Sequence, residues 1–394
     1  MNSFESELHR RLASINEAGL LRELRRVDSA QGPQIEIGGR VLLNFSSNDY
    51  LGLANHPALK EASVKAVERF GAGSGASRLI CGSLAPFHEL EEALAAFKGT
   101  KAALSFSTGY AAAVGTITAL LGKDDIVIVD KLVHACIVDA AKLSGAKLRV
   151  FDHNDLNDLE DILKWATSEL RNQKSETRTL IITESIFSMD GDSAPLAEIV
   201  SLKEKYGAWL MVDEAHATGL YGANRRGLAE ALGVSDSIEI QMGTLGKALG
   251  ASGGYICGSR ALIDYLINRA RSFIFSTAPV PAAAAAATAG IKLVQSNEGK
   301  ARNETLWALV ADFQSAIGNR QSAIPSAILP LIIGDETKAV ATANSLREQG
   351  LFVPAIRYPT VARGSARLRI TLTATHTTQD VSKLTNALAT LASD

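Results

Sequence analysis

Short runs of apolar residues recur along the middle of the chain, and they are continuous rather than alternating with polar residues. Continuous runs of this length are typical of β-strands that are covered on both faces of a sheet. Between several of them, apolar residues return every three or four positions, which predicts amphipathic helices near 156–163 and 196–203. Strands that alternate with helices indicate an α/β domain with a mostly parallel sheet. The runs are DIVIVD (125–130), KLRVFD (147–152), TLIITE (179–184), WLMVDE (209–214), IEIQMG (238–243) and GGYICG (253–258).

Helical patterns also flank this region. Apolar residues at helical spacing predict one helix over 87–97, a mostly buried helix over 109–122, and a tightly packed alanine-rich helix that begins at Pro281. The segment 61–70 is helical in pattern as well.

After about residue 285 the pattern changes to that of a smaller α+β domain. We therefore expect three parts: an N-terminal arm over 1–47, a large domain over 48–285 and a small C-terminal domain over 286–394. The elements predicted in the last part are helices around 306–317, 340–346 and 381–391 and strands over 327–334, 351–357 and 366–372.

Composition and charge narrow the class of protein. The chain has 394 residues, of which 46% are hydrophobic and 21% charged, so it has ample material for a core. Its net charge is −2 without a block of Lys or Arg, which argues against a protein that tracks nucleic acid. Cys81, Cys136 and Cys257 are scattered, which argues against a disulfide framework or a metal site. With no apolar signal core and no long apolar run, we expect a cytoplasmic protein without a membrane span.

Polar residues follow the predicted strands, and several of them have reactive side chains. In open parallel sheets, ligands bind beyond the carboxyl ends of the strands, so these residues are expected to gather at one edge. They are two histidines, three acidic groups, one lysine and a hydroxyl: Asp130, His134, Glu184, Asp213, His216, Thr244 and Lys247.

Two short motifs suggest other functions but lack their context. The letters DEAH at 213–216 name a group of ATP-driven helicases, which also need G-x-x-x-x-G-K-[ST] to hold phosphates. Before Gly246-Lys247, the first glycine is replaced by Gln241, and Ala248 stands where Ser or Thr should follow, so that loop is absent. GAGSGA (71–76) matches a dinucleotide fingerprint, but it follows a helical pattern instead of a strand.

The set of strand-end residues suits pyridoxal phosphate (PLP) chemistry. A lysine amine forms an imine with the cofactor, an aspartate pairs with the pyridinium nitrogen, and hydroxyls with helix N-terminal amides hold the phosphate. Each residue alone has a common structural explanation, since a turn lysine is usually solvated, a strand-end aspartate often caps a helix, and a lone histidine is more often structural. The combination, in this order along the chain, favours the PLP interpretation.

Six longer motifs give the chain a family resemblance. It resembles the α-oxoamine synthases, which are fold-type-I PLP acyltransferases, over nearly its whole length. The resemblance implies a large domain around a mostly parallel seven-stranded sheet, a smaller α+β domain, and a homodimer with shared active sites. The motifs are NFSSNDYLGL (44–53), GSGASR (73–78), TESIFSMDGDSAPL (183–196), VDEAHATG (212–219), TLGKALG (244–250) and IRYPTVARGSARLRITL (356–372).

The resemblance also implies roles for single residues toward the cofactor. Lys247 would form the imine and, once released by the substrate, would remove the Cα proton. Asp213 would face the pyridinium nitrogen and His216 the phenolic oxygen, while His134 would stack on the ring and touch the substrate. Further cofactor contacts would come from Ser107, Gly109, Tyr110, Glu184, Ser188 and Thr244, and from Ser276 and Thr277 of the second subunit.

Four more residues would meet the substrates. Arg357 resembles the family arginine that binds the amino acid's carboxylate, with help from Asn48. Arg22 and Thr360 match positions that contact the acyl thioester.

The implied reaction is the decarboxylative condensation of L-alanine with a pimeloyl thioester of CoA or of a carrier protein, in biotin biosynthesis. The main alternative is a sister enzyme that uses another amino acid or acyl chain, such as 2-amino-3-ketobutyrate CoA ligase, 5-aminolevulinate synthase or serine palmitoyltransferase. A non-catalytic binding protein derived from the family should have lost Lys247 or Asp213, and the chain has kept both.

Overall fold

The computed structural model describes residues 3–171, 177–318 and 324–393. Contacts between Cα atoms divide the chain into unit 1 (Met1–Asn48, Met189–Gly191 and Thr305–Asp394) and unit 2 (Asp49–Ser188 and Asp192–Glu304). This grouping puts the N-terminal residues with the C-terminal ones and extends the larger unit to Glu304. The sequence predicts a different division, into an arm and two domains. It remains a prediction about which parts of the chain fold independently.

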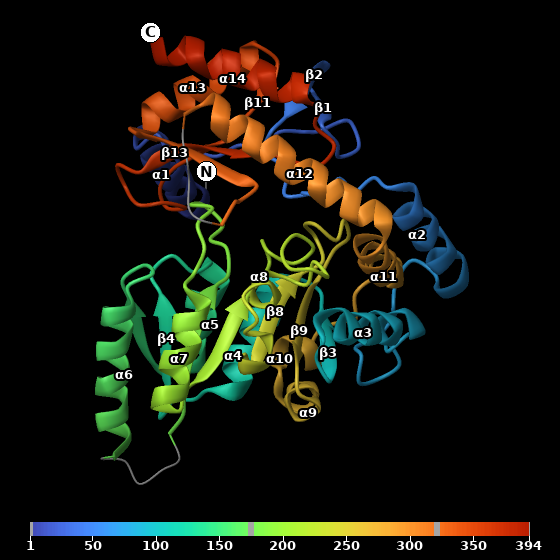
Figure 1. Cartoon of the computed structure of the whole chain (residues 1–394), viewed down its shortest axis with the longest axis vertical. Helices are drawn as coiled ribbons and strands as arrows, with labels where there is room; N and C mark the ends of the chain where they lie inside the picture. Colours follow the sequence, from blue (N-terminus) through green and yellow to red (C-terminus); the bar gives the residue numbers. More distant parts are fainter. Residues whose placement is uncertain (1–2, 172–176, 319–323, 394) are drawn as a thin grey trace. The chain divides into compact units, whose positions relative to one another are not determined.

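Unit 2 is built around a seven-stranded sheet with the strand order β3-β9-β8-β7-β6-β4-β5 (Figure 1). Five strands from β4 to β8 run parallel to their neighbours, whereas β9 is antiparallel to both β8 and β3. The mostly parallel sheet is therefore confirmed, with one reversed strand that the sequence did not predict. The strands are β3 (Ala102–Phe106), β4 (Ile126–Asp130), β5 (Lys147–Phe151), β6 (Thr179–Glu184), β7 (Trp209–Asp213), β8 (Ile240–Thr244) and β9 (Gly254–Gly258).

Both faces of this sheet are covered by helices. Val127, Val129 and Met211 share one apolar core with residues of α4 and α5. Ile128 and Leu210 are also buried but alternate with that set, so they point to the other face, where α6 and α7 pack. Burial on both faces explains why the strands read as continuous apolar runs.

The predicted helices of unit 2 are all present. Pro281 is the first residue of α11, as predicted, and the loop 71–76 follows a helix, which confirms that it is not a strand-to-helix turn. The helices are α2 (Pro57–Phe70), α3 (Ala85–Lys98), α4 (Gly109–Leu120), α5 (Ala135–Ser144), α6 (Leu156–Arg171), α7 (Leu196–Tyr206), α8 (Leu228–Ala231), α9 (Arg260–Arg269), α10 (Arg271–Ile274) and α11 (Pro281–Gln295).

Unit 1 contains two small sheets and its own helices. The hairpin β1–β2 is extended by β11, which pairs in parallel with β2, while β10, β13 and β12 form the second sheet. Pro354 separates β11 from β12, so the single strand predicted over 351–357 is two short ones. The elements are α1 (Ser3–Glu17), β1 (Gln34–Ile37), β2 (Arg40–Asn44), β10 (Ile328–Gly334), α13 (Glu336–Glu348), β11 (Leu351–Phe352), β12 (Ala355–Ile356), β13 (Ala366–Thr371) and α14 (Thr378–Ser393); α12 (Asn297–Ala316) contains the last boundary between the units.

Residues 189–191 are a short piece of unit 1 between two segments of unit 2. Arg367 on β13 donates to the carbonyl oxygen of Met189 at 3.2 Å and pairs with the Asp190 carboxylate at 2.5 Å. Gly191 has φ +71°, and a Cβ added there would lie 2.3 Å from the Ile328 carbonyl oxygen. Glycine at this position therefore meets both a steric and a conformational requirement.

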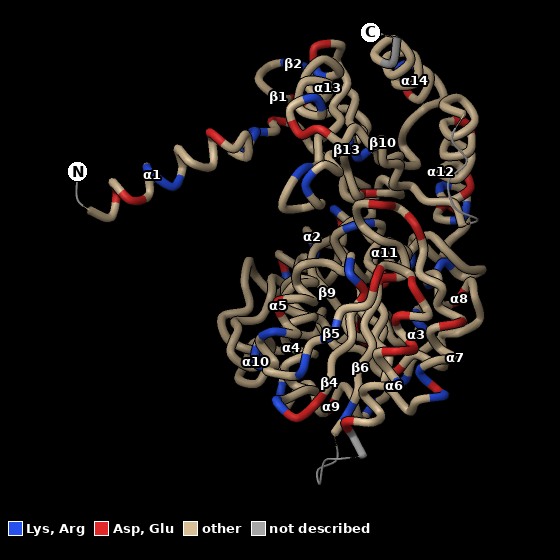
Figure 2. Tube along the Cα trace, turned by 90° about the vertical axis from the view of Figure 1, so that its left-hand side faces the viewer, with Lys and Arg blue, Asp and Glu red and all other residues tan. Residues whose placement is uncertain are grey.

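Acidic and basic residues are mixed along the trace of each unit (Figure 2). This mixture agrees with the small net charge. Among the described residues, no helix combines the length and the apolar character that crossing a membrane requires.

Candidate active site

Two carboxylates lie side by side at the carboxyl edge of the unit 2 sheet. Glu184 is the last residue of β6 and Asp213 the last of β7, and they are direct partners in the parallel register. Both are buried. Burial is the main reason why the pKa of each carboxyl is raised; the charge of Lys247 opposes this for both, and the charge of Asp213 adds to it for Glu184.

Asp213 is held by the backbone that follows it. Its Oδ1 accepts a hydrogen bond from the amide of Ala215 at 2.9 Å. This contact and the positive charge of Lys247 favour the ionised carboxylate. A cation placed against Asp213 would therefore find an acceptor that is already oriented.

Lys247 lies in the loop that joins β8 to β9, and its amine meets a histidine. Lys247 Nζ is 2.7 Å from Nε2 of His216, which follows β7. On the other side of the imidazole ring, the hydroxyl of Tyr50 is 2.5 Å from Nδ1. The structure thus brings together two of the residues predicted from the sequence and adds a third, Tyr50.

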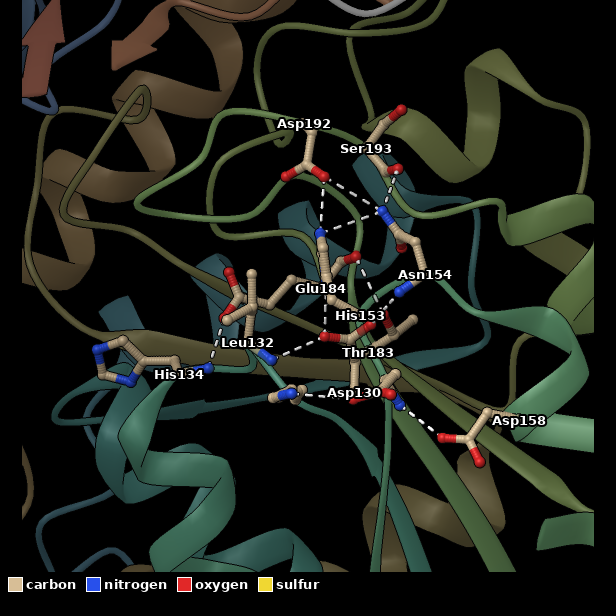
Figure 3. Close-up of polar contacts among 12 residues, drawn as sticks. Asp130, Leu132, His134, His153, Asn154, Asp158, Thr183, Glu184, Asp192 and Ser193 are labelled. Atoms are coloured by element: carbon tan, nitrogen blue, oxygen red, sulfur yellow. Dashed lines mark hydrogen bonds and ion pairs between the residues drawn. The ribbon is translucent and has the colours of Figure 1, made fainter. Parts of the chain in front are cut away.

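His134 is the N-cap of α5 and is fixed by its neighbours (Figure 3). Its backbone amide donates to Oε1 of Glu184 at 2.6 Å, and its Nδ1 accepts from the amide of Cys136 at 3.2 Å. Partial burial lowers the pKa of His134, which favours a neutral ring. Glu184 therefore supports His134 through the backbone, a contact that the sequence did not indicate.

Beside His134, a second histidine bridges two aspartates (Figure 3). His153 Nδ1 lies 2.9 Å from Asp130 and Nε2 lies 2.7 Å from Asp192. Although burial lowers it, the hydrogen bonds to both carboxylates raise the pKa of His153 to about 10. Asp130 Oδ1 also accepts from the amide of Leu132 at 2.8 Å, so the charged bridge stabilises the turn that leads to His134.

Three of the predicted cofactor contacts, Ser107, Gly109 and Tyr110, lie at the start of α4, where the phosphate is expected. Gly109 is the first residue of the helix, and a helix N-terminus offers amides and a positive dipole to an anion. Tyr110 donates its hydroxyl proton to Asp139 at 2.5 Å. Ser107 lines a very small cavity together with Ser276 and Thr277 of the same chain.

Of the two remaining hydroxyl residues, Thr244 is the last residue of β8 and Ser188 lies in the turn after β6. Thr244 Oγ1 donates to the Gly253 carbonyl oxygen at 3.0 Å and accepts from the Gly246 amide at 3.2 Å, so it shapes the loop that carries Lys247. The Ser188 backbone donates a hydrogen bond that lowers the pKa of Glu184.

Apart from His134, the predicted substrate residues belong to unit 1, and three of them come together there. Arg22 Nη2 donates to Thr360 Oγ1 at 3.3 Å, while the Arg357 guanidinium donates to the carbonyl oxygens of Gly19 and of Leu21. A cavity of about 660 Å³ is lined by these residues and by two more arginines, Arg25 and Arg347. Asn48 is the last residue of the N-terminal stretch of unit 1.

Glu214, the second letter of the DEAH string, makes contacts that are separate from those described above. Its carboxylate is fully buried and pairs with Lys98, which also donates to the Arg226 carbonyl oxygen at 2.5 Å. Its other oxygen accepts from the amide of Ala229 at 2.9 Å. Glu214 is therefore part of a buried ion pair, which agrees with its having no acid–base role.

These residues fit PLP. One edge of the sheet carries a primary amine, a helix N-terminus and a buried carboxylate whose ionised form is favoured by a nearby cation. Lys247 would hold the aldehyde carbon, Asp213 the ring nitrogen, and the first turn of α4 the phosphate.

Sequence reasoning did not single out three polar residues of unit 2, Tyr50, Lys98 and His153, and one of unit 1, Arg369. Tyr50 and Arg369 lie within the motifs 44–53 and 356–372, but a motif does not say which of its polar residues is buried. Both are buried, and Arg369 Nη1 donates to Thr371 Oγ1 at 3.0 Å. Lys98 and His153 lie outside every motif, so only their burial and contacts identify them.

Comparisons with known proteins agree with this geometry. Residues 40–388 match the family model of aminotransferase class I and II. The chain is 47% identical over 392 residues to 8-amino-7-oxononanoate synthase of Geotalea daltonii, covering 99% of this chain and 97% of the relative. It is 48% identical over 381 residues to the synthase of Geobacter sulfurreducens, covering 96% of each chain.

Solved structures give the same fold. A serine palmitoyltransferase from S. paucimobilis with bound PLP–myriocin aldimine is 29% identical, with a TM-score of 0.90 over 99% of this chain and 98% of that one. An 8-amino-7-oxononanoate synthase from Francisella tularensis is 28% identical, with a TM-score of 0.76 over 89% of this chain and 98% of that one.

The buried ion pair predicts a large effect of a small substitution. Glu214→Gln keeps the volume of the side chain but leaves Lys98 buried without its charge partner. We expect the free energy of unfolding, measured in urea, to fall by about 3–5 kcal/mol. Glu61→Gln, which removes a surface pair with Lys65, is the control and should cost less than about 1 kcal/mol. Equal effects of the two substitutions would contradict the role of the buried pair.

Proposed function

Because the chain belongs to the family of class I and II aminotransferases, and within it to the 8-amino-7-oxononanoate synthases, we propose that it catalyses the synthase reaction with PLP as its cofactor. In this reaction an acyltransferase condenses L-alanine with a pimeloyl thioester. The products are 8-amino-7-oxononanoate, carbon dioxide and free CoA, or the free carrier protein if that is the acyl donor. The reaction is a step of biotin biosynthesis.

The observation that carries the proposal is the meeting of Lys247 with His216 at the sheet edge that also holds Asp213. PLP, when bound, supplies an electron sink for the electron pair left at Cα of the amino acid. Asp213 holds the proton on the ring nitrogen, because a buried carboxylate strongly favours a cationic partner. Without that charge the electron sink would weaken.

Lys247 and His216 act together on the proton at Cα of the amino acid. Once released from the cofactor, the Lys247 amine is a base in reach of the amino acid's Cα proton. His216 Nε2 is within hydrogen-bond distance of that amine, so the imidazole orients it. His134, held in place by Glu184, would cover the ring of the bound cofactor and shield it from water.

The sister enzymes of the family are a less favoured alternative. The serine palmitoyltransferase structures share the fold at 29–30% identity, whereas the synthases from Geotalea and Geobacter are 47% and 48% identical over nearly the whole chain. A pocket changes its preferred amino acid or acyl chain through a few side chains, so the closer overall similarity supports alanine and a pimeloyl chain.

We also propose a homodimer. Unit 2 exposes four large apolar side chains on two loops, Leu79, Ile80, Phe275 and Val280, which we call the apolar loop patch. The loops are joined by the bridge Ser77–Thr277, so these side chains lie on neighbouring segments. A second copy of the chain would cover them and would bring its Ser276 and Thr277 to the phosphate residues.

The cytoplasm is the proposed location. Cys81, Cys136 and Cys257 are free thiols, which suits a reducing compartment. Cell fractionation with an antibody against the protein tests this placement.

A matrix of substrates tests the function. Alanine, glycine and serine are each combined with pimeloyl-, acetyl- and palmitoyl-CoA, and the release of free CoA is measured. We expect alanine with pimeloyl-CoA to give the highest kcat/KM by at least about tenfold, since one methylene or hydroxyl changes discrimination by this order. Lys247→Ala should be inactive with every pair and should not be trapped with PLP by borohydride. A preference for glycine with acetyl-CoA would instead identify a 2-amino-3-ketobutyrate ligase.

Two arginines compete for the role of binding the amino acid's carboxylate. Arg357 was predicted from the sequence, but its guanidinium already donates to two backbone carbonyls, whereas Arg369 is buried beside Thr371. We expect Arg369→Lys to raise the KM for alanine by about tenfold or more and to leave the KM for the thioester unchanged, because lysine lacks the planar fork. Arg363→Lys, which changes an exposed arginine stacked on Tyr358, is the control. If only Arg357→Lys raised this KM, the prediction from the sequence would stand.

Substitutions in the apolar loop patch test the dimer. Ile80→Glu with Phe275→Glu should raise the dimer dissociation constant by at least about a hundredfold, since each of the two side chains loses roughly 1.5–3 kcal/mol of burial and about 1.4 kcal/mol corresponds to a factor of ten. Analytical ultracentrifugation measures the change. Leu143→Glu replaces an equally exposed apolar residue away from the patch and should leave the mass unchanged. A wild-type protein that sediments as a monomer at micromolar concentration would refute the proposal.

A further inference from the structure

Tyr50 is a buried tyrosine whose hydroxyl contacts the active-site histidine. Its oxygen is 2.5 Å from Nδ1 of His216, and the two rings meet edge to face with their centroids 6.0 Å apart. Nε2 of the same imidazole is 2.7 Å from Lys247 Nζ. Three segments that are distant in the sequence therefore form one chain of hydrogen bonds: phenol, imidazole and amine.

The chain of hydrogen bonds fixes the position of a proton. A neutral imidazole has one nitrogen that donates and one that accepts. If Tyr50 donates to Nδ1, the imidazole proton lies on Nε2 and points to Lys247. If the proton lies on Nδ1 instead, it points to the tyrosine oxygen, and Nε2 accepts from the lysine. The arrangement decides whether Nε2 of His216 donates a hydrogen bond or accepts one on the side of Lys247.

The chemistry of the site favours the first arrangement. In the resting protein the ammonium form of Lys247 donates to Nε2, but to react with an aldehyde Lys247 must lose that proton, and the neutral amine then accepts a hydrogen bond from Nε2–H. The phenolic oxygen of PLP is also an acceptor, so it too needs a donor at Nε2. A phenol, with a pKa near 10, is a much better donor than a neutral imidazole.

We propose that Tyr50 is a positioning residue: by donating its proton to Nδ1 of His216, it holds the imidazole in the Nε2–H tautomer that faces Lys247 and the cofactor. The hydrogen bond on one ring nitrogen sets the protonation of the other. The part of this proposal that concerns the cofactor rests on the proposed function, whereas the tautomer is a property of the protein alone.

The tautomer can be measured without substrate or turnover. In the apoprotein labelled with ¹⁵N-histidine, at a pH at which the Lys247 amine is neutral, NMR should show His216 with its proton on Nε2, whereas the ammonium form of Lys247 would donate to Nε2 instead. The signals are assigned by their loss in His216→Gln. In Tyr50→Phe, a mixture of tautomers should appear. Tyr255→Phe is the matched control, because Tyr255 is equally buried and its hydroxyl is 2.7 Å from Thr218 instead. A wild-type proton on Nδ1 would overturn the proposal even if Tyr50→Phe failed to fold.

The holoenzyme supplies a second test, which distinguishes positioning from a merely structural role. Tyr50→Phe should raise the dissociation constant of PLP, read from its absorbance, and lower kcat, each by about tenfold, with the KM for the thioester unchanged, since a buried acceptor loses its donor. In a His216→Gln background the same substitution should have almost no further effect on PLP binding. An effect of equal size in both backgrounds would show that Tyr50 does not act through His216.

If the substrate matrix failed while the tautomer shifted as expected, the proposed function would be wrong and the role of Tyr50 would stand. If the matrix succeeded and the tautomer did not depend on Tyr50, only the positioning role would be lost.

Discussion

The site depends on one electrostatic constraint, the burial of two carboxylates next to each other. Glu184 and Asp213 end neighbouring parallel strands, and the register places them side by side. Their neighbours offset the repulsion: the amides of His134 and Ala215 donate to them, and Lys247 supplies a positive charge. The N-cap of α5 thus contacts these carboxylates through a hydrogen bond, and the β8–β9 loop interacts with them through the charge of Lys247. A positively charged ring beside Asp213 would relieve the remaining repulsion.

Much of this arrangement could be predicted from the sequence. Five of the six continuous apolar runs are buried strands because both faces of the sheet are covered there, whereas the edge strand β5 exposes Arg149 and Val150. The polar residues after the parallel strands share an edge because those strands run in one direction. The strand β3, with the sequence AALSF, was missed since alanine and serine give little apolar signal. The reversed direction of β9 could not be predicted, because a continuous run reports burial on two faces and not direction.

Sequence patterns could not predict contacts between side chains that are far apart in the sequence. Tyr50 and His216 are separated by 166 positions, and Lys98 and Glu214 by 116. Nothing in the spacing of apolar residues specifies such pairs. Even the arginine of the IRYPT segment, identified by resemblance, donates to backbone carbonyls of Gly19 and Leu21, 338 and 336 positions away, which no motif contains. Residue types at strand ends indicated the chemistry, but only the fold shows which neighbours tune it.

The pairing of β2 with β11 has a consequence for how the protein is made. Leu43 lies opposite Leu351, so the N-terminal hairpin completes its sheet only after the rest of the chain has been synthesised. At ribosomal rates of about 5–20 residues per second, that hairpin waits on the order of 15–60 s for its partner strand. During this interval β2 has a free edge that other nascent chains could pair with. The N-terminal stretch is thus the part of the molecule that would most depend on chaperones.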